Sequence, residues 1–223
     1  MTILSIIYLE PEWQQTKACI EATGLPAVYV HRKPKGIGSL AEAINRGVKQ
    51  IEDEYTWIVT NVTFEPDAPV HLLADVGDYA ILHPAFASDH EFCRPDGSGV
   101  VKRVPFVEFT CPLVKTSVLK QYPLNENMPY WGHDPDFGYR MWKSGHRVGV
   151  HHGVEIGHTY IRHNNVYNQV TTLRKRARKS ADYQTHYELK RIYGITWRER
   201  ILPRTIEKAE KYFNDNCLRD RNG

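Results

Sequence analysis

Two hydrophobic patterns alternate along the first 85 residues of the chain. Short apolar runs typical of buried strands occur at Ile3–Leu9, Ala27–His31, Tyr55–Thr60 and Asp78–His83. Helical segments separate the first three runs, at Glu12–Thr23, which ends at Gly24, and from Leu40 to Ile51, where Ser39 is the predicted N-cap. Strands that alternate with helices predict βαβ units and a parallel sheet. Ligands of such sheets bind at the carboxyl ends of the strands.

The pattern after residue 85 is less regular. A loop-like segment, 89–102, precedes a longer predicted strand, Val104–Val114. The remaining predicted elements are helices at Thr116–Gln121 and His133–Ser144, strands at His146–His151 and Val154–His158, and helices at 170–193 and 204–218. We therefore predict one α/β domain over 1–165, with halves at about 1–85 and 86–165, followed by a basic helical extension over 166–223.

Composition narrows the class of protein. The chain has 223 residues, a net charge of +3 and four scattered cysteines without a C-x-x-C pair, which argues against a disulfide scaffold or a cysteine-rich zinc site. Its longest uncharged apolar run, Ile3–Leu9, is far shorter than the ~20 residues that span a bilayer. The N-terminus lacks the features of a signal peptide. We expect a soluble protein of the cytoplasm, or of a host cytoplasm if a bacteriophage encodes it, with peripheral membrane contact left open.

Four groups of residues are candidates for chemistry. The turn Gly36–Ala41 matches the dinucleotide-binding pattern G-x-G-x-x-A, but it follows the second predicted strand instead of the first, so a simple turn before a helix is favoured. Asp134 and Asp136 lie at the start of a predicted helix, where carboxylates are either helix caps or a general base and metal ligands. His158 ends a predicted strand and is either a structural histidine or a metal or phosphate ligand.

The fourth group is the basic run from Arg174 to Lys179. Such a run is usually a solvated helix face. It is also compatible with contact to phosphate in a nucleic acid or an anionic membrane.

Taken together, these pieces resemble the family 2-like glycosyltransferases of the GT-A fold over roughly residues 2–194. The resemblance is formed by the N-x-G triplet Asn45-Arg46-Gly47, the segment Ile58–Asp67, the motif His133-Asp134-Pro135-Asp136 with Arg140, the strand ending in His158, and Tyr187–Gly194. It implies a mixed, mainly parallel sheet flanked by helices, with a nucleotide-binding first half and an acceptor-binding, catalytic second half. Asn61 stands where the family has a metal-binding Asp, and His133 stands where it has an acid.

The resemblance implies a role for each matching residue. Asp134 is the expected general base, with Asp136 beside it. The expected donor-binding residues are Leu9, Glu10, His31, Arg32, Gly38, Asn45, Thr60, Asn61 and Arg140. Asn61 and His158 are expected to hold a divalent cation, Mn²⁺ or Mg²⁺, although an Asn contributes no charge to it. Tyr130, Trp131 and His133 are expected to line the acceptor site.

The implied reaction is transfer of a sugar from a nucleotide-diphosphate donor to an acceptor hydroxyl, with inversion. The acceptor is either a glycan or glycolipid, or a hydroxylated base in DNA such as some bacteriophages make. Two other functions remain open. One is a nucleic-acid-binding protein that uses the basic segment, and the other is a non-catalytic sugar-nucleotide binder, suggested by Asn61 and His133.

Overall fold

A single seven-stranded sheet organises the computed structural model. The structure describes residues 1–7, 10–32, 39–88, 90–128, 131–158, 182–198, 207, 208 and 211. The strand order is β2-β1-β3-β7-β5-β8-β6. The strands are β1 (Thr2–Ile7), β2 (Ala27–His31), β3 (Tyr55–Val59), β5 (Tyr79–Ala85), β6 (Val101–Arg103), β7 (Leu113–Lys115) and β8 (Arg147–Glu155).

Most of this sheet is parallel, as the sequence predicts. β1 pairs in parallel with β2 and β3, and β5 pairs in parallel with β8. β7 lies between β3 and β5 and is antiparallel to both, and β6 is antiparallel to β8. A second, two-stranded sheet joins β4 (Val62–Thr63) to β9 (Gly157–His158). Strands from both predicted halves of the domain therefore share one main sheet.

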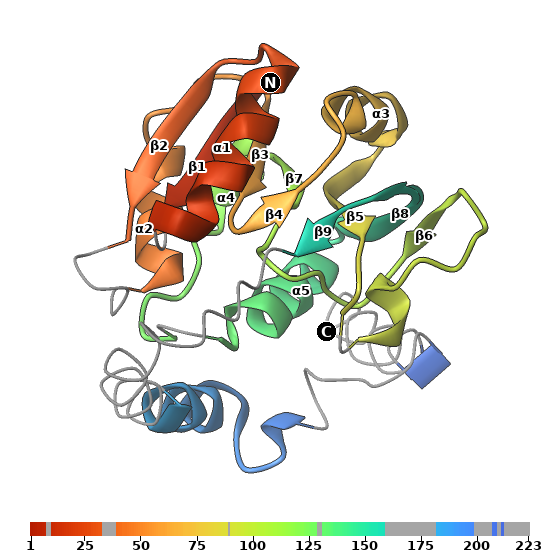
Figure 1. Ribbon diagram of the computed structural model, residues 1–223. Helices are drawn as coiled ribbons and strands as arrows, with labels where there is room; N and C mark the ends of the chain where they lie inside the picture. Colours follow the sequence, from red (N-terminus) through yellow and green to blue (C-terminus); the bar gives the residue numbers. More distant parts are fainter. Residues whose placement is uncertain are drawn as a thin grey trace, which may run out of the picture.

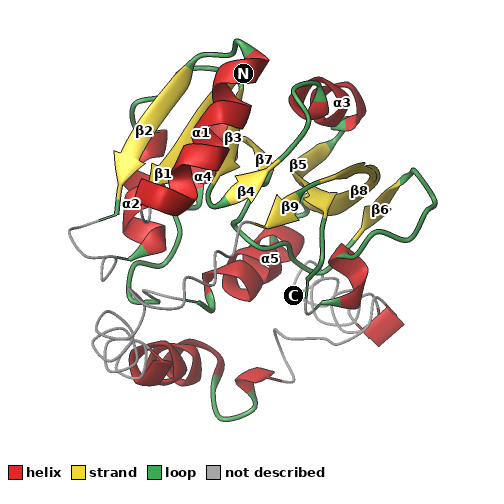
Figure 2. Cartoon of the chain, viewed as in Figure 1, coloured by secondary structure: helices red, strands yellow, loops and turns green. Residues whose placement is uncertain are grey.

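Helices pack against the sheet. They are α1 (Glu10–Thr23), α2 (Leu40–Val48), α3 (Ala68–Asp75), α4 (Thr116–Gln121) and α5 (His133–Lys143), with a short 3₁₀ turn, η2 (Glu91–Cys93). Figure 1 shows α1 in front of β1 and β3 and α2 behind them, and Figure 2 shows the same layers by secondary structure. α2 also packs on α4, and α3 and α5 pack against β8. No helix in the described ranges is long and apolar enough to cross a bilayer.

Helix α2 begins as its sequence predicts. Ser39 is the N-cap, and its side-chain oxygen accepts a hydrogen bond from the backbone N–H of Glu42 at 3.2 Å. The helix ends at Val48, three residues before the predicted end at Ile51. Gly47 faces β1, where a Cβ atom would stand 2.3 Å from Leu4 Cδ1. The absent side chain lets α2 lie close to the sheet.

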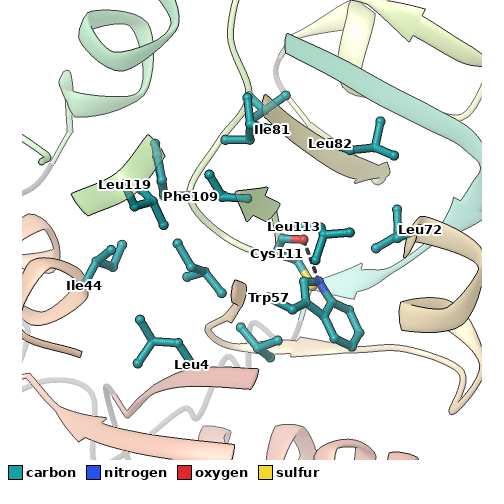
Figure 3. Packing of buried hydrophobic residues seen from close by; sticks show 14 of the residues in the cluster. Leu4, Ile44, Trp57, Leu72, Ile81, Leu82, Phe109, Cys111, Leu113 and Leu119 are labelled. Atoms are coloured by element: carbon teal, nitrogen blue, oxygen red, sulfur yellow. Dashed lines mark hydrogen bonds between the residues drawn. The ribbon is translucent and has the colours of Figure 1, made fainter. Parts of the chain in front are cut away.

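The core is centred on Trp57, which is fully buried. Its indole N–H donates to the carbonyl oxygen of Cys111 at 3.0 Å, so the one polar atom of the ring is satisfied inside the core. Figure 3 shows this hydrogen bond, with Leu4 of β1 and Leu113 of β7 among the apolar side chains around the indole. The core thus spans both predicted halves of the domain.

Residues 104–114 do not form the long strand that the sequence predicts. Only Leu113 and Val114 of that range belong to a strand, β7, and the residues before them are irregular. Pro105 and Pro112 explain the difference, because neither has the backbone N–H that a strand ladder needs. The apolar residues of the segment are nevertheless buried, so its hydrophobicity reflects burial and not strand formation.

Other boundaries also differ from the prediction. The predicted strands at 146–151 and 154–158 are one nine-residue strand, β8, followed by β9. Helix α3 and strands β4 and β6 were not predicted from the sequence. Of the predicted helix over 170–193, residues 182–193 are helical and the rest lies outside the described residues. The helix predicted over 204–218 is described only at 207, 208 and 211, all helical. The predicted boundary at 165 lies outside the described residues.

Candidate active site

Asp134 lies in the first turn of α5, with its carboxylate fixed in place. Its Oδ1 accepts a hydrogen bond from the backbone N–H of Phe109 at 2.8 Å, and its side chain is 17% exposed. Within the described residues, Oδ2 has no protein partner, so one oxygen is held while the other can take a proton. The adjoining His133 is buried, and its Nε2 lies 3.6 Å from Asp134 Oδ1.

The turn before α5 requires a glycine. Gly132 is the N-cap residue and has φ = 90°, a left-handed conformation that favours glycine. A Cβ atom there would also stand 2.7 Å from Cγ2 of Thr185, which belongs to the helix over 182–193. That helix therefore packs directly against the turn that positions Asp134.

Asp136 has a different environment from Asp134. It is buried, its Oδ1 accepts a hydrogen bond from the Tyr193 hydroxyl at 2.7 Å, and its Oδ2 accepts from Arg140 Nε at 3.0 Å. Burial, and then the charge of Asp136, raises the pKa of Tyr193, which stays protonated. Asp136 therefore links α5 to the 182–193 helix through Tyr193, and Arg140 binds Asp136 and the carbonyl oxygen of Pro123, while the catalytic and donor-binding roles expected of the two residues stay predictions.

The segment that follows β3 lies beside β9. Thr60 and Asn61 follow β3, and the next residue, Val62, pairs with His158 across the β4–β9 ladder. The backbones of Asn61 and His158 are therefore neighbours, as expected for two residues that share a ligand. Burial lowers the pKa of His158 below its ordinary value, so the imidazole is neutral at pH 7.

One short segment connects this strand end to the base. Phe109 donates its N–H to Asp134, and the carbonyl oxygen of the next residue, Thr110, accepts from the Thr60 N–H at 2.9 Å and the Thr60 hydroxyl at 3.1 Å. Consecutive Cα atoms are only about 3.8 Å apart. The start of α5 and the end of β3 are therefore attached to adjacent residues of the same segment.

His83 holds the same segment from the other side. Its Nε2 lies 2.9 Å from the Thr110 hydroxyl and accepts from the Cys111 N–H at 3.3 Å, while Nδ1 contacts the carbonyl oxygen of Pro84. This arrangement places the proton on Nδ1. Burial lowers the pKa of His83 to about 4. Sequence reasoning missed His83 and Thr110, because nothing in the local pattern marks two residues 27 positions apart as partners.

A second carboxylate also went unnoticed in the sequence. Glu108 accepts a hydrogen bond from the Ser88 hydroxyl at 2.6 Å. The pKa of the buried Cys93 thiol is raised by burial first and then by the charges of Glu108 and Asp134. Both carboxylates are therefore near Cys93, and a further acid lies close to the candidate base.

The expected donor-binding residues divide into two groups. His31 ends β2 opposite Ile7 of β1, at the carboxyl edge of the sheet, and Arg32 follows it. Asn45 is used elsewhere. Its side chain exchanges hydrogen bonds at 2.9 Å with the backbone of Leu124, so it fixes the loop that contains Leu124. Leu9 and Gly38 lie outside the described residues, as does the side chain of Glu10.

Two of the three residues expected to line the acceptor site contact other parts of the protein. The Trp131 indole N–H donates to Asp182 at 2.7 Å, and the ring is 5.1 Å from that of His186. His133 is buried beside Phe109. Trp131 therefore holds the 182–193 helix in place. Tyr130 lies outside the described residues.

A cavity of about 530 Å³ lies along α5, from Asp136 in its first turn to Lys143 at its end. It is lined by Arg140 and Lys143 of α5, Asn125, and Tyr193 of the C-terminal helix, among others. Its polar members Asp136, Arg140 and Tyr193 already bind one another, as described above. Asp134 is not among its lining residues, although Asp136, two positions later, is.

The described residues do not form a metal centre by themselves. They include no group of three or more His, Cys, Asp or Glu side chains that could hold an ion. Asn61 and His158 supply a neutral amide and an imidazole, whereas Mg²⁺ and Mn²⁺ prefer carboxylate oxygens. The donor set in this part of the chain therefore does not fit a divalent cation without further ligands.

Comparison with solved structures identifies the architecture. No family model and no curated protein matches the chain. The structure is similar to GalNAc-T7 crystallised with UDP, GalNAc and Mn²⁺, with a TM-score of 0.58 at 8% identity, over 100% of this chain and 57% of that one. It is also similar to TarS 1-349 of S. aureus, with a TM-score of 0.54 at 11% identity, over 97% of this chain and 74% of that one. The chain has the GT-A fold.

Two further solved structures are similar to the chain. A197 from STIV matches with a TM-score of 0.52 at 10% identity, over 72% of this chain and 86% of that one. TarS 1-349 in complex with UDP matches with a TM-score of 0.50 at 12% identity, over 97% of this chain and 74% of that one. The predicted GT-A-like fold class is therefore confirmed. The likeness to family 2 in particular stays a prediction.

Proposed function

We propose that this protein is a glycosyltransferase that moves a sugar from a nucleotide-diphosphate donor to an acceptor hydroxyl. One observation supports this function above the others. Asp134 and Thr60 bind adjacent residues, Phe109 and Thr110, so a carboxylate stands beside the strand end next to Asn61. A base at the carboxyl edge of a sheet, close to a nucleotide site, is what glycosyl transfer needs.

The reaction needs one proton transfer and one displacement. The acceptor oxygen forms a bond to the anomeric carbon as the bond from that carbon to the diphosphate breaks, and Asp134 Oδ2 takes the hydroxyl proton. The Phe109 N–H holds Oδ1 and thereby orients the base. A single in-line displacement of this kind inverts the anomeric centre. The diphosphate leaves with its negative charge, which His158 stabilises by donating a hydrogen bond.

The donor is proposed to lie across the ends of β1, β2 and β3. His31 and Arg32 are at that edge, and Thr60 and Asn61 follow the third strand. UDP is the first nucleotide to test, because two of the similar crystal structures contain it. A Mn²⁺ or Mg²⁺ requirement remains a proposal and is tested by adding each ion to the same assay.

The test compares two Asp→Asn substitutions. Asp134→Asn should lower transfer by at least ~10²-fold, the usual worth of a general base, while nucleotide binding measured by thermal shift stays close to wild type. Asp67→Asn is the matched control, because Asp67 likewise stands at a helix N-terminus, as the N-cap of α3, and its side chain is 69% exposed. Turnover of Asp134→Asn within threefold of wild type would refute the assignment of the base.

Asn61 favours one other function, a non-catalytic sugar-nucleotide binder. Such a protein would bind nucleotide diphosphates but would neither hydrolyse the donor nor transfer its sugar. Wild type and Asp134→Asn would then be equally inactive. A nucleotide-binding screen followed by a donor-hydrolysis assay separates the two functions. The acceptor, whether a glycan, a glycolipid or a hydroxylated DNA base, is identified by offering each class to the wild-type enzyme with its preferred donor.

A further inference from the structure

The outward face of the 182–193 helix exposes large apolar side chains. Tyr183 is 67% exposed, Tyr187 is 71% exposed, and Ile195, just after the helix, is 83% exposed. These are the three most exposed large hydrophobic side chains in the described part of the chain. Isolated exposed apolar residues are normal, but three within thirteen residues of the sequence are a local concentration of exposed apolar surface.

This concentration results from the helical repeat. Tyr183 and Tyr187 are four residues apart, and Lys190 follows three residues later, so all three lie on one face of the helix. The opposite face is docked. Thr185 and Leu189 are buried there against the turn before α5 and its neighbours. The docked face holds the helix in place and leaves the tyrosine face outward.

This face is also part of the most basic stretch of the chain. Residues 170–204 include ten Lys or Arg and three Asp or Glu, which gives a net charge of +7. The rest of the chain has 19 Lys or Arg and 23 Asp or Glu, which gives a net charge of −4. Lys190 and Arg191 are exposed on the helix itself. The two acids of the helix are engaged with the protein. Asp182 accepts a hydrogen bond from Trp131, and Glu188 accepts one from Asn125 and forms an ion pair with Arg191 at 2.8 Å, so Lys190 is the main cationic contribution of the helix to this face.

We propose that the helix face formed by Tyr183, Tyr187 and Lys190, together with the exposed Ile195 just beyond the helix, binds the surface of an anionic phospholipid bilayer. Tyrosine is suited to the boundary between headgroups and acyl chains, since its ring is apolar and its hydroxyl is polar. Ile195 favours a bilayer over a nucleic-acid backbone, because an aliphatic side chain gains free energy from burial among acyl chains and makes no favourable contact with phosphate. Lys190 on the face is attracted to anionic headgroups, and the net positive charge of residues 170–204 adds to that attraction. Membrane binding is inferred from the exposure and charge of this face, and it does not depend on the proposed transferase activity.

Binding would hold the candidate active site close to the membrane. The helix contacts Trp131 and Gly132, which directly precede the first turn of α5. A protein bound through this face would present the Asp134 end of α5 near the lipid surface, within reach of an acceptor embedded there. An acceptor attached to a lipid would then be favoured over a free one.

The experiment measures co-sedimentation of the full chain with vesicles, without any donor. One set of vesicles is phosphatidylcholine with about a third phosphatidylserine, and the other is pure phosphatidylcholine. We expect binding to the first set, weaker at higher salt, and little binding to the second. Tyr183→Ser with Tyr187→Ser should lower the partition coefficient by at least about tenfold, since two largely exposed rings lose their burial in the interface. Lys190→Gln should lower it by about fivefold.

Matched substitutions elsewhere test whether the effect is local. Val70→Ser removes a 63% exposed apolar side chain from α3, and Lys49→Gln removes an exposed lysine after α2. Neither should change vesicle binding. All variants are surface changes and should melt like wild type. Equal binding to both sets of vesicles, wild-type binding by the double serine variant, or tighter binding to duplex DNA than to anionic vesicles would each overturn the proposal. Because no donor is present, these outcomes are independent of whether the protein is a glycosyltransferase.

Discussion

Removing the hydroxyl of Tyr193 should destabilise the protein. In Tyr193→Phe, Asp136 loses the 2.7 Å hydrogen bond to its Oδ1 and keeps Arg140 on Oδ2. A hydrogen bond to a charged group contributes about 1.5–3 kcal/mol, and Asp136 is buried, so water cannot replace the lost donor without local opening. We expect the free energy of unfolding to fall by that amount. For a protein of this size, the melting temperature should fall by about 3–12 °C.

The matched control is Tyr187→Phe, on the same helix. It makes the same chemical change at a side chain that is 71% exposed, and it should alter stability by less than about 0.5 kcal/mol. The assay is urea unfolding of both variants and wild type at pH 7, followed by circular dichroism. If Tyr193→Phe unfolds at the same urea concentration as Tyr187→Phe, then the hydrogen bond from Tyr193 to Asp136 does not hold the C-terminal helix to α5.

Three further predictions test other parts of the site. Burial lowers the pKa of His83 from 6.5 to about 4, so the unfolded chain takes up a proton first as the pH falls. The free energy of unfolding should therefore drop between pH 6.5 and 4, by at most about 3 kcal/mol for this group, and His83→Gln should flatten that slope in urea unfolding. His158→Ala should weaken calorimetric binding of a nucleoside diphosphate more than that of the nucleoside, and equal losses would mean a structural role only. Gly138→Ala would place a Cβ atom 2.4 Å from Phe106 Cβ. It should lower the free energy of unfolding, measured in urea, by about 1–3 kcal/mol.

The sequence predicts the repetitive part of this fold and not its irregular part. The strands β1, β2, β3 and β5 and the Ser39 cap depend on local patterns, which a single sequence displays. The segment 104–114 was predicted wrongly because burial and strand formation give the same apolar pattern. Only the two prolines distinguished them.

The candidate site divides in the same way. The position of Asp134 at a helix start and of His158 at a strand end follows from local pattern and from the resemblance to glycosyltransferases. The hydrogen bonds of Asn45 and Trp131 cannot be predicted in this way, because their partners, Leu124 and Asp182, are 79 and 51 positions away in the sequence. Long-range hydrogen bonds decide whether a polar residue faces a ligand or another part of the chain, and one sequence does not contain that information.

Strand β7 has a consequence for synthesis of the protein. It is three residues long, it pairs with both β3 and β5, and it joins the two parallel parts of the sheet. A ribosome-bound chain that has reached residue 85 has made β3 and β5 but not the strand that separates them. Both edges would then be unpaired and apolar, a state that favours aggregation. The first 85 residues should therefore not work as a transferable nucleotide-binding module, and fragment exchange between proteins of this fold should use junctions beyond β7.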